Sequence, residues 1–204
     1  AFAPEVQTCY VDHDFHRTPE KMTPRLQEEI DRASAYAQQI TVGYGLCSQG
    51  TAGLIAPRQG LWIPRVHDCI ALYLGSLTRY EKEFAHNPGT YYLTEAWIRN
   101  ERDPLGIIEQ DYTPRVGYET AVWAMEEELK NYSRIAFIRT TPSEENTDEL
   151  EDRAKENARR LQKEYVEIQG SSTLFQLMLQ DPSASDDFAY VEEGAKVTLD
   201  LFET

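Results

Sequence analysis

The chain has 204 residues, of which 41% are hydrophobic and 27% charged, a composition typical of a globular protein rather than a disordered one. Its formal net charge of -15 argues against nucleic-acid or membrane binding, because neutralising phosphates requires clustered lysines and arginines. No apolar run approaches the roughly 18 residues of a membrane-spanning helix, and no secretory leader opens the sequence. We therefore expect one domain over residues 1–204.

The first half of the chain shows two helical patterns around two short apolar strands. Residues 19–37 carry apolar side chains at i, i+4 spacing and begin near a proline, which predicts an amphipathic helix. Residues 39–45 are typical of a buried strand that runs into glycines. Residues 60–64 are typical of a second strand, which ends at a proline. Residues 68–84 then predict a helix with an apolar face, for which Asp68 is a suitable N-cap.

The second half continues the alternation of strands and helices. After an irregular section (90–117), the predicted elements are a helix (118–131), a strand (134–140), a charged helix (147–164), a strand (165–170), a short helix (172–180) and a closing hairpin (188–202). Such alternation implies right-handed crossovers between parallel strands. The predicted fold class is α/β, with a doubly wound, mostly parallel sheet, helices on both faces and a C-terminal hairpin.

Chemistry-bearing side chains follow the two early strands. Cys47 comes directly after residues 39–45, and His67 and Cys69 come directly after residues 60–64. In open α/β sheets, functional loops gather beyond the carboxyl ends of the strands. If both strands are parallel neighbours, these three side chains converge on one point.

Two cysteines and a histidine are a donor set that suits zinc, iron or another thiophilic metal. Cys69 falls in the first turn of a predicted helix, where exposed N–H groups favour a thiolate. A fourth ligand is available from His16 or His13, which precede the first helix, or from a bound molecule. The sequence thus predicts a metal site formed by Cys47, His67 and Cys69.

Other interpretations of the same residues stay open. Free cysteine is among the most buried residue types, so Cys47 and Cys69 could simply fill the core, and His67 could hydrogen-bond a carbonyl. Alternatively, Cys47 is a nucleophile and His67 its base. Cys9 stands in a segment that could be an edge strand, where its role would be structural. Three scattered cysteines do not make a disulfide framework, which favours a cytoplasmic location.

Three longer motifs suggest a family. The stretches "ITVGYGLCSQG", "LWIPRVHDCIALYLGS" and "NPGTYYLTEAWI", in this order and spacing, resemble the domain of unknown function DUF1638. The upstream segment "DFHRTPEKM" is similar to a segment of the same family. The resemblance implies a protein of anaerobic archaea or bacteria, often encoded near corrinoid-dependent methyltransferases.

The matching positions imply a shared site. The metal ligands that the resemblance implies are Cys47, His67, Cys69 and His16. The residues that it places around a bound cofactor are Arg65, Asp68, Tyr91 and Trp97. The chain departs from the family where Ser48 and Ala96 replace glycines, and where an N-terminal strand carrying a cysteine precedes the matched region in relatives.

The function that these observations predict is a small cytoplasmic metal- or metallo-cofactor-binding protein, linked by the resemblance to corrinoid-dependent methyl transfer. Zinc is the first expectation for the cofactor, with iron or an iron-containing cofactor second. The expected partners are corrinoid or methyltransferase proteins, within a homo- or hetero-oligomer. The alternatives are a thiol enzyme, or a non-catalytic subunit that uses the aromatic-rich residues 90–123 as a contact surface. Whether a reaction is catalysed is left open.

Overall fold

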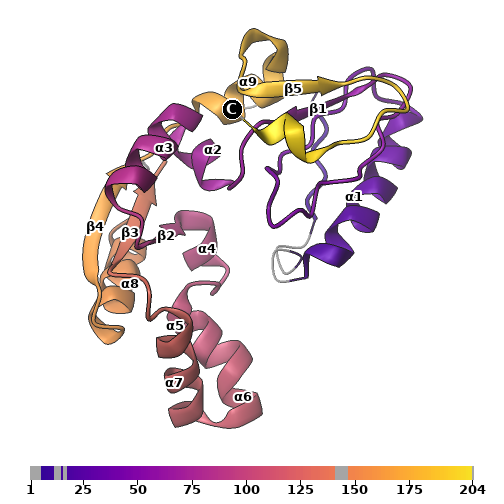
Figure 1. Cartoon of the computed structure of the whole chain (residues 1–204). Helices are drawn as coiled ribbons and strands as arrows, with labels where there is room; N and C mark the ends of the chain where they lie inside the picture. Colours follow the sequence, from indigo (N-terminus) through magenta and orange to yellow (C-terminus); the bar gives the residue numbers. More distant parts are fainter. Residues whose placement is uncertain (1–5, 12–14, 16–17, 141–146, 204) are drawn as a thin grey trace. The chain divides into compact units, whose positions relative to one another are not determined.

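The computed structural model describes residues 6–11, 15, 18–140 and 147–203 (Figure 1). The chain divides into two compact units. The first comprises Ala1–Leu72 and Thr173–Thr204, and the second comprises Tyr73–Ser172. That the whole chain acts as one domain stays a prediction.

The first unit contains a long helix, a two-stranded sheet and several irregular segments. Its elements are α1 (Pro19–Ser34), β1 (Leu61–Pro64), the start of α2 (Ile70–Leu74), α9 (Thr173–Gln180), a 3₁₀ turn (Pro182–Ala184), β5 (Phe188–Val191) and a second 3₁₀ turn (Leu199–Phe202). The strands β1 and β5 pair antiparallel, with Leu61 opposite Val191. This pairing joins two segments that are far apart in the sequence.

The apolar stripe of α1 builds the core of this unit. Met22, Leu26 and Ile30 are buried at i, i+4 spacing, as the sequence pattern predicts. They belong to the same apolar cluster as Leu61 of β1 and Phe202 near the carboxyl end of the chain. Burial of these side chains therefore fixes α1 against the sheet.

Residues 40–47 run parallel to residues 61–67, as the sequence analysis expected. The backbone N–H of Val42 donates to the carbonyl of Trp62 over 2.9 Å, and that of Leu46 donates to the carbonyl of Val66 over 2.8 Å. The only regular pairing assigned between the two described segments is the bridge of Thr41 with Trp62. The first segment is thus an irregular strand that follows β1 and continues past its carboxyl end.

The second unit is built on a parallel sheet of three strands in the order β2 (Thr90–Thr94), β3 (Arg134–Arg139) and β4 (Glu164–Gln169). Its helices are α3 (Leu77–His86), α4 (Glu95–Arg99), α5 (Pro104–Gly106), a π-helical segment (Ile107–Tyr112), α6 (Thr113–Val116), α7 (Tyr118–Glu128) and α8 (Thr147–Arg160). In β2, the ring of Tyr91 packs against Tyr132 at a centroid distance of 5.5 Å, and that of Tyr92 lies 6.3 Å from Tyr80 of α3. Because successive strand residues point to opposite faces, α3 contacts the face opposite to Tyr132.

A buried polar network holds the start of α5 to α8. The carboxylate of Asp103 is completely buried. It accepts hydrogen bonds from Arg153 Nε at 2.8 Å, from Asn157 Nδ2 at 2.9 Å and from the N–H of Gly106 at 3.2 Å. The side-chain oxygen of Asn157 in turn accepts from the N–H of Leu105 at 2.9 Å. A charge buried in this way is stabilised because every partner donates to it.

Three sequence-based expectations for the fold need correction. Residues 188–202 do not form a hairpin, because β5 pairs with the distant β1 instead. The predicted helix 68–84 is two helices, α2 and α3, separated at Gly75, whose φ of +77° a helix cannot accommodate. The section 90–117 is not irregular, because it contains β2 and several short helices. Its many aromatic residues concealed the pattern of the strand.

The observed fold is a mixed α/β arrangement that is simpler than the predicted doubly wound sheet. The three parallel strands follow in chain order, without the reversal that defines a doubly wound sheet, in the part of the chain that is described. The strand that ends at Pro64 lies in the separate antiparallel pair. Within the same described residues, no helix is long and apolar enough to cross a membrane.

Candidate thiol site

Cys47 and Cys69 meet in the first unit. Their Sγ atoms lie 2.9 Å apart, within hydrogen-bonding distance of each other. The parallel course of residues 40–47 and 61–67 produces this contact, since the N–H of Cys47 donates to the carbonyl of His67 over 3.2 Å. Cys47 is buried and Cys69 is half-buried. The structure therefore brings together two of the four predicted metal ligands.

Cys47 is the first residue of a turn with left-handed backbone. The φ angles of Cys47, Ser48 and Gln49 are 45°, 56° and 70°. The N–H of Gly50 closes the turn by donating to the carbonyl of Cys47 over 3.1 Å. Left-handed backbone costs a residue with a Cβ about 1–2 kcal/mol. Three such residues in succession are a local strain that the surrounding contacts must offset, and strain of this kind clusters at functional sites.

Gly45 allows the two segments to approach closely. A Cβ at this position would lie 2.4 Å from the carbonyl oxygen of Val66. The N–H of Gly45 points to Cys69 Sγ at 3.5 Å. Its carbonyl accepts from the buried hydroxyl of Thr51 at 3.0 Å, which ties the turn back onto the segment that precedes it. Glycine at this position is thus required by space, because a Cβ would collide with the Val66 carbonyl.

Cys69 lies just before α2. Asp68 caps the helix, since its carboxylate accepts the N–H of Ile70 at 2.9 Å. The helix has only five residues, so its macrodipole is weaker than that of the longer helix predicted for residues 68–84. The contacts that stabilise a Cys69 thiolate are instead the Cys47 thiol and the Gly45 N–H.

The two thiols differ strongly in acidity. The pKa of Cys69 is lowered, first because its sulfur accepts a hydrogen bond from Cys47, while burial opposes the effect. The pKa of Cys47 is raised, first because it donates that bond and then because it is buried. The pair therefore loses its first proton more easily than its second. Burial, followed by the two neighbouring cysteines, raises the pKa of Tyr44 to about 12.

Sequence reasoning missed two residues that support the pair. The half-buried hydroxyl of Tyr44 donates to the carbonyl of Val11 at 3.3 Å and so connects the site segment to the N-terminal residues. Thr51 is completely buried despite its polarity. No local spacing identifies either of them, because their roles depend on which segments lie beside them.

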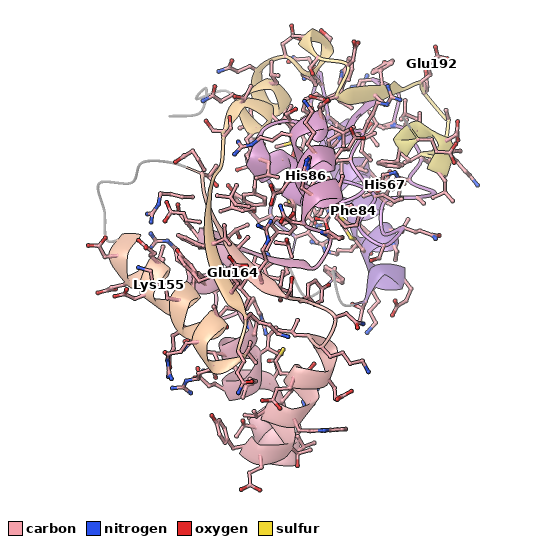
Figure 2. All side chains as sticks on the ribbon, turned by 60° about the vertical axis from the view of Figure 1, so that its left-hand side comes forward. His67, Phe84, His86, Lys155, Glu164 and Glu192 are labelled. Atoms are coloured by element: carbon pink, nitrogen blue, oxygen red, sulfur yellow. The ribbon has the colours of Figure 1, made fainter. Side chains whose placement is uncertain are left out.

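His67 does not complete a ligand set with the cysteines. His67, labelled in Figure 2, is exposed. Its ring lies 6.4 Å from the ring of Phe202. Among the described residues, no group of three or more His, Cys, Asp or Glu side chains is placed to hold a metal ion. His16 and His13 lie outside the described residues. The metal assignment of His67 and His16 stays a prediction.

The four residues expected around a cofactor are divided between the units. Arg65 binds the C-terminal segment, because Nε donates to the carbonyl of Leu201 at 3.0 Å and an Nη to that of Glu203 at 3.2 Å. Asp68 is the helix cap described above. Tyr91 and Trp97 belong to the second unit, where Tyr91 packs on Tyr132 and the N–H of Trp97 donates to Thr94. Arg65 is therefore engaged in a structural contact, and its cofactor role stays a prediction.

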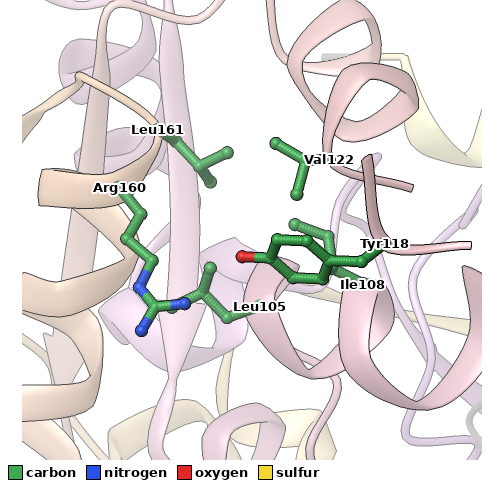
Figure 3. A pocket seen from close by; sticks show the side chains of 6 residues that line it. All are labelled: Leu105, Ile108, Tyr118, Val122, Arg160 and Leu161. Atoms are coloured by element: carbon green, nitrogen blue, oxygen red, sulfur yellow. The ribbon is translucent and has the colours of Figure 1, made fainter. Parts of the chain in front are cut away.

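The second unit has a small apolar hollow of about 280 Å³ (Figure 3). The residues that line it are Leu105, Ile108, Tyr118, Val122, Arg160 and Leu161. Its volume falls just below the range of about 300–1,000 Å³ typical of small-molecule sites. The charged group at its edge, Arg160, is already paired with Glu156 at 2.6 Å. The cysteine pair is therefore the stronger candidate site.

Comparison with known proteins identifies the family. Residues 10–179 match the model described as "Protein of unknown function (DUF1638)". This match covers most of the chain and includes Cys47, His67 and Cys69, so the chain belongs to the DUF1638 family. No curated protein and no solved structure matches the chain.

Proposed function

We propose that this protein binds a thiophilic metal ion or metallo-cofactor through Cys47 and Cys69. The observation that carries the proposal is the convergence of the two sulfur atoms to 2.9 Å from separate segments of the chain. Thiolates are the preferred ligands of zinc and of soft transition metals. The hydrogen bond from the Cys47 thiol lowers the pKa of Cys69, which favours its thiolate as a metal ligand.

The pair fits a metal as part of a ligand set. Zinc–sulfur bonds of about 2.3 Å at a tetrahedral centre separate two sulfur atoms by about 3.8 Å. The two cysteines would thus move apart by about 0.9 Å to share a zinc ion. The remaining ligands would come from His67, which lies next to the site in sequence, from His16, or from the cofactor itself. A coordinated metal would keep both thiols deprotonated.

The family resemblance suggests the chemical setting. In corrinoid-dependent methyl transfer, a metal that holds a thiol deprotonated would activate it as a methyl acceptor. In that setting, the protein would serve methyltransferase partners by binding, delivering or reacting the metallo-cofactor. The contribution of this chain's own residues is the same in each case, since the two cysteines hold the soft metal.

The test is elemental analysis of anaerobically purified protein, repeated on three single variants. We expect about one equivalent of zinc or iron in the native chain and in Cys9→Ser, because Cys9 is exposed and stands outside the pair. Cys47→Ser and Cys69→Ser should each lose most of the metal. Less than about 0.2 equivalents in the native chain, unchanged by Cys47→Ser, would contradict metal binding.

A thiol enzyme is the second candidate, and the hydrogen bond from Cys47, which lowers the pKa of Cys69, favours it. In this scheme Cys69 is the nucleophile, and its hydrogen-bond partner is Cys47 rather than His67. Alkylation of metal-free protein with iodoacetamide, located by peptide mass, should then modify Cys69 before Cys9. Equal labelling of the two, or labelling of Cys9 first, would count against it.

A further inference from the structure

Only two donor groups converge at the thiol site in the described part of the chain, and both are sulfur. A metal centre normally has three or four protein ligands. Two thiols in contact, by contrast, are sufficient to form a dithiol–disulfide couple. The sulfur atoms at 2.9 Å need to approach by only about 0.9 Å to reach a disulfide bond length of about 2.05 Å.

We infer that Cys47 and Cys69 form a reversible intramolecular disulfide by exchange with a small-molecule disulfide of the glutathione type. The first attack comes from Cys69, the half-buried residue of the pair. Its sulfur attacks the reagent RSSR, so that a Cys69–SR bond forms, the RS–SR bond breaks and one RS⁻ leaves. Cys47 then attacks the Cys69 sulfur, which forms the protein disulfide and releases the second RS⁻.

Atoms and electrons balance in this exchange. The two thiol protons end on the two released thiolates, giving two RSH. Both cysteine sulfurs are oxidised, and the two sulfurs of the reagent are reduced. No other oxidant is required.

The fold around the pair suits this exchange. The left-handed turn at Cys47–Gln49 and the closure at Gly45 hold the buried thiol against its partner, so a mixed disulfide on Cys69 is formed within reach of Cys47. Resolution by a neighbouring thiol of the same chain is faster than a second intermolecular attack, because the effective concentration is high. Cys9 is exposed and its thiol interacts with Glu29, so it serves as an internal control.

A consequence for the metal rests on the proposed function. A disulfide sulfur is no longer a thiolate ligand, so oxidation of the pair would release a metal bound there. The site would then have a reduced, metal-binding state and an oxidised, metal-free state.

The experiment uses the full chain, reduced anaerobically, freed of metal with a chelator and then treated with oxidised glutathione. Trypsin cleavage after Arg58 and Arg65 separates the two cysteines into residues 33–58 and 66–79. We expect these peptides to be joined by a bond that dithiothreitol breaks, in the native chain and in Cys9→Ser alike. Cys47→Ser should instead keep a glutathione adduct on Cys69.

Two results would overturn the inference. One is a native chain that keeps glutathione on Cys47 or Cys69 without joining the two peptides. The other is a linkage only through Cys9. A parallel zinc-binding measurement on reduced and oxidised chain separates the two proposals. Zinc binding to the reduced chain without disulfide formation refutes the disulfide alone, and disulfide formation without zinc binding refutes the proposed function alone.

Discussion

The two units stabilise their backbones in different ways. In the second unit, β3 pairs in register with a parallel neighbour on each side, and its central residues, Ile135 to Ile138, are all buried. In the described part of the first unit, the two-stranded sheet pairs only four residues of β1 with β5, and the segment beside β1 ends in a strained left-handed turn. Both units bury an apolar core, but the first unit also depends on individual close contacts, which place its two cysteines together.

The largest expected effect lies in the core of the regular unit. Phe137 of β3 is completely buried among the apolar side chains of the second unit. Phe137→Ala should lower the free energy of unfolding by about 3–5 kcal/mol, because it leaves a cavity that the sheet cannot close. Urea denaturation measures the loss. Phe84→Ala, at a side chain that is 50% exposed, is the control, and an equal loss there would contradict the comparison.

The buried network at Asp103 should show the next effect. Arg153 contacts two carboxylates, those of the buried Asp103 at 2.8 Å and of the exposed Glu109 at 3.0 Å. Asp103→Ala should cost about 3 kcal/mol, since it leaves the Arg153 charge and the Asn157 amide without their buried partner. Glu109→Ala should cost at most about 1 kcal/mol, because water screens the exposed pair. Similar losses for both variants would show that burial does not determine how much each ion pair contributes to stability.

The close contact at Gly45 tests the irregular unit. Gly45→Ala places a Cβ against the Val66 carbonyl and should destabilise the chain by about 1–3 kcal/mol. It should also separate the cysteines and lower both metal content and the yield of the Cys47–Cys69 disulfide. Gly43→Ala is the matched control, because its Cβ would meet only the flexible end of Met178, at 3.3 Å. Unchanged yields in Gly45→Ala would refute its positioning role.

The smallest effect concerns strain at the turn itself. Ser48 has a φ of 56° at a position where the sequence resemblance implies glycine in relatives. Ser48→Gly should therefore raise the free energy of unfolding by up to about 1 kcal/mol. Ser48→Ala should give no gain, since alanine keeps the Cβ that causes the strain. Thermal denaturation of both variants separates relief of strain from loss of the hydroxyl.

Several features of the fold could be predicted because they depend on local pattern. The stripe of Met22, Leu26 and Ile30 predicted α1, and the apolar run 134–140 predicted β3. The parallel approach of residues 40–47 and 61–67 was also expected, from the rule that strands of an α/β protein end at a common edge. The partner of Phe188–Val191 could not be predicted, because a short strand carries no signal that distinguishes a hairpin neighbour from β1.

The sequence by itself determined the family, through three long motifs, and it predicted Cys47 and Cys69 as site residues from their positions after apolar segments. Only the tertiary structure decided that Cys47 and Cys69 touch, that His67 is exposed, and that Arg65 binds the C-terminal backbone. The physical reason is that side-chain chemistry is local, whereas a contact of 2.9 Å depends on the register of two segments. That register is fixed here by the space that Gly45 leaves free and by the left-handed turn that follows it.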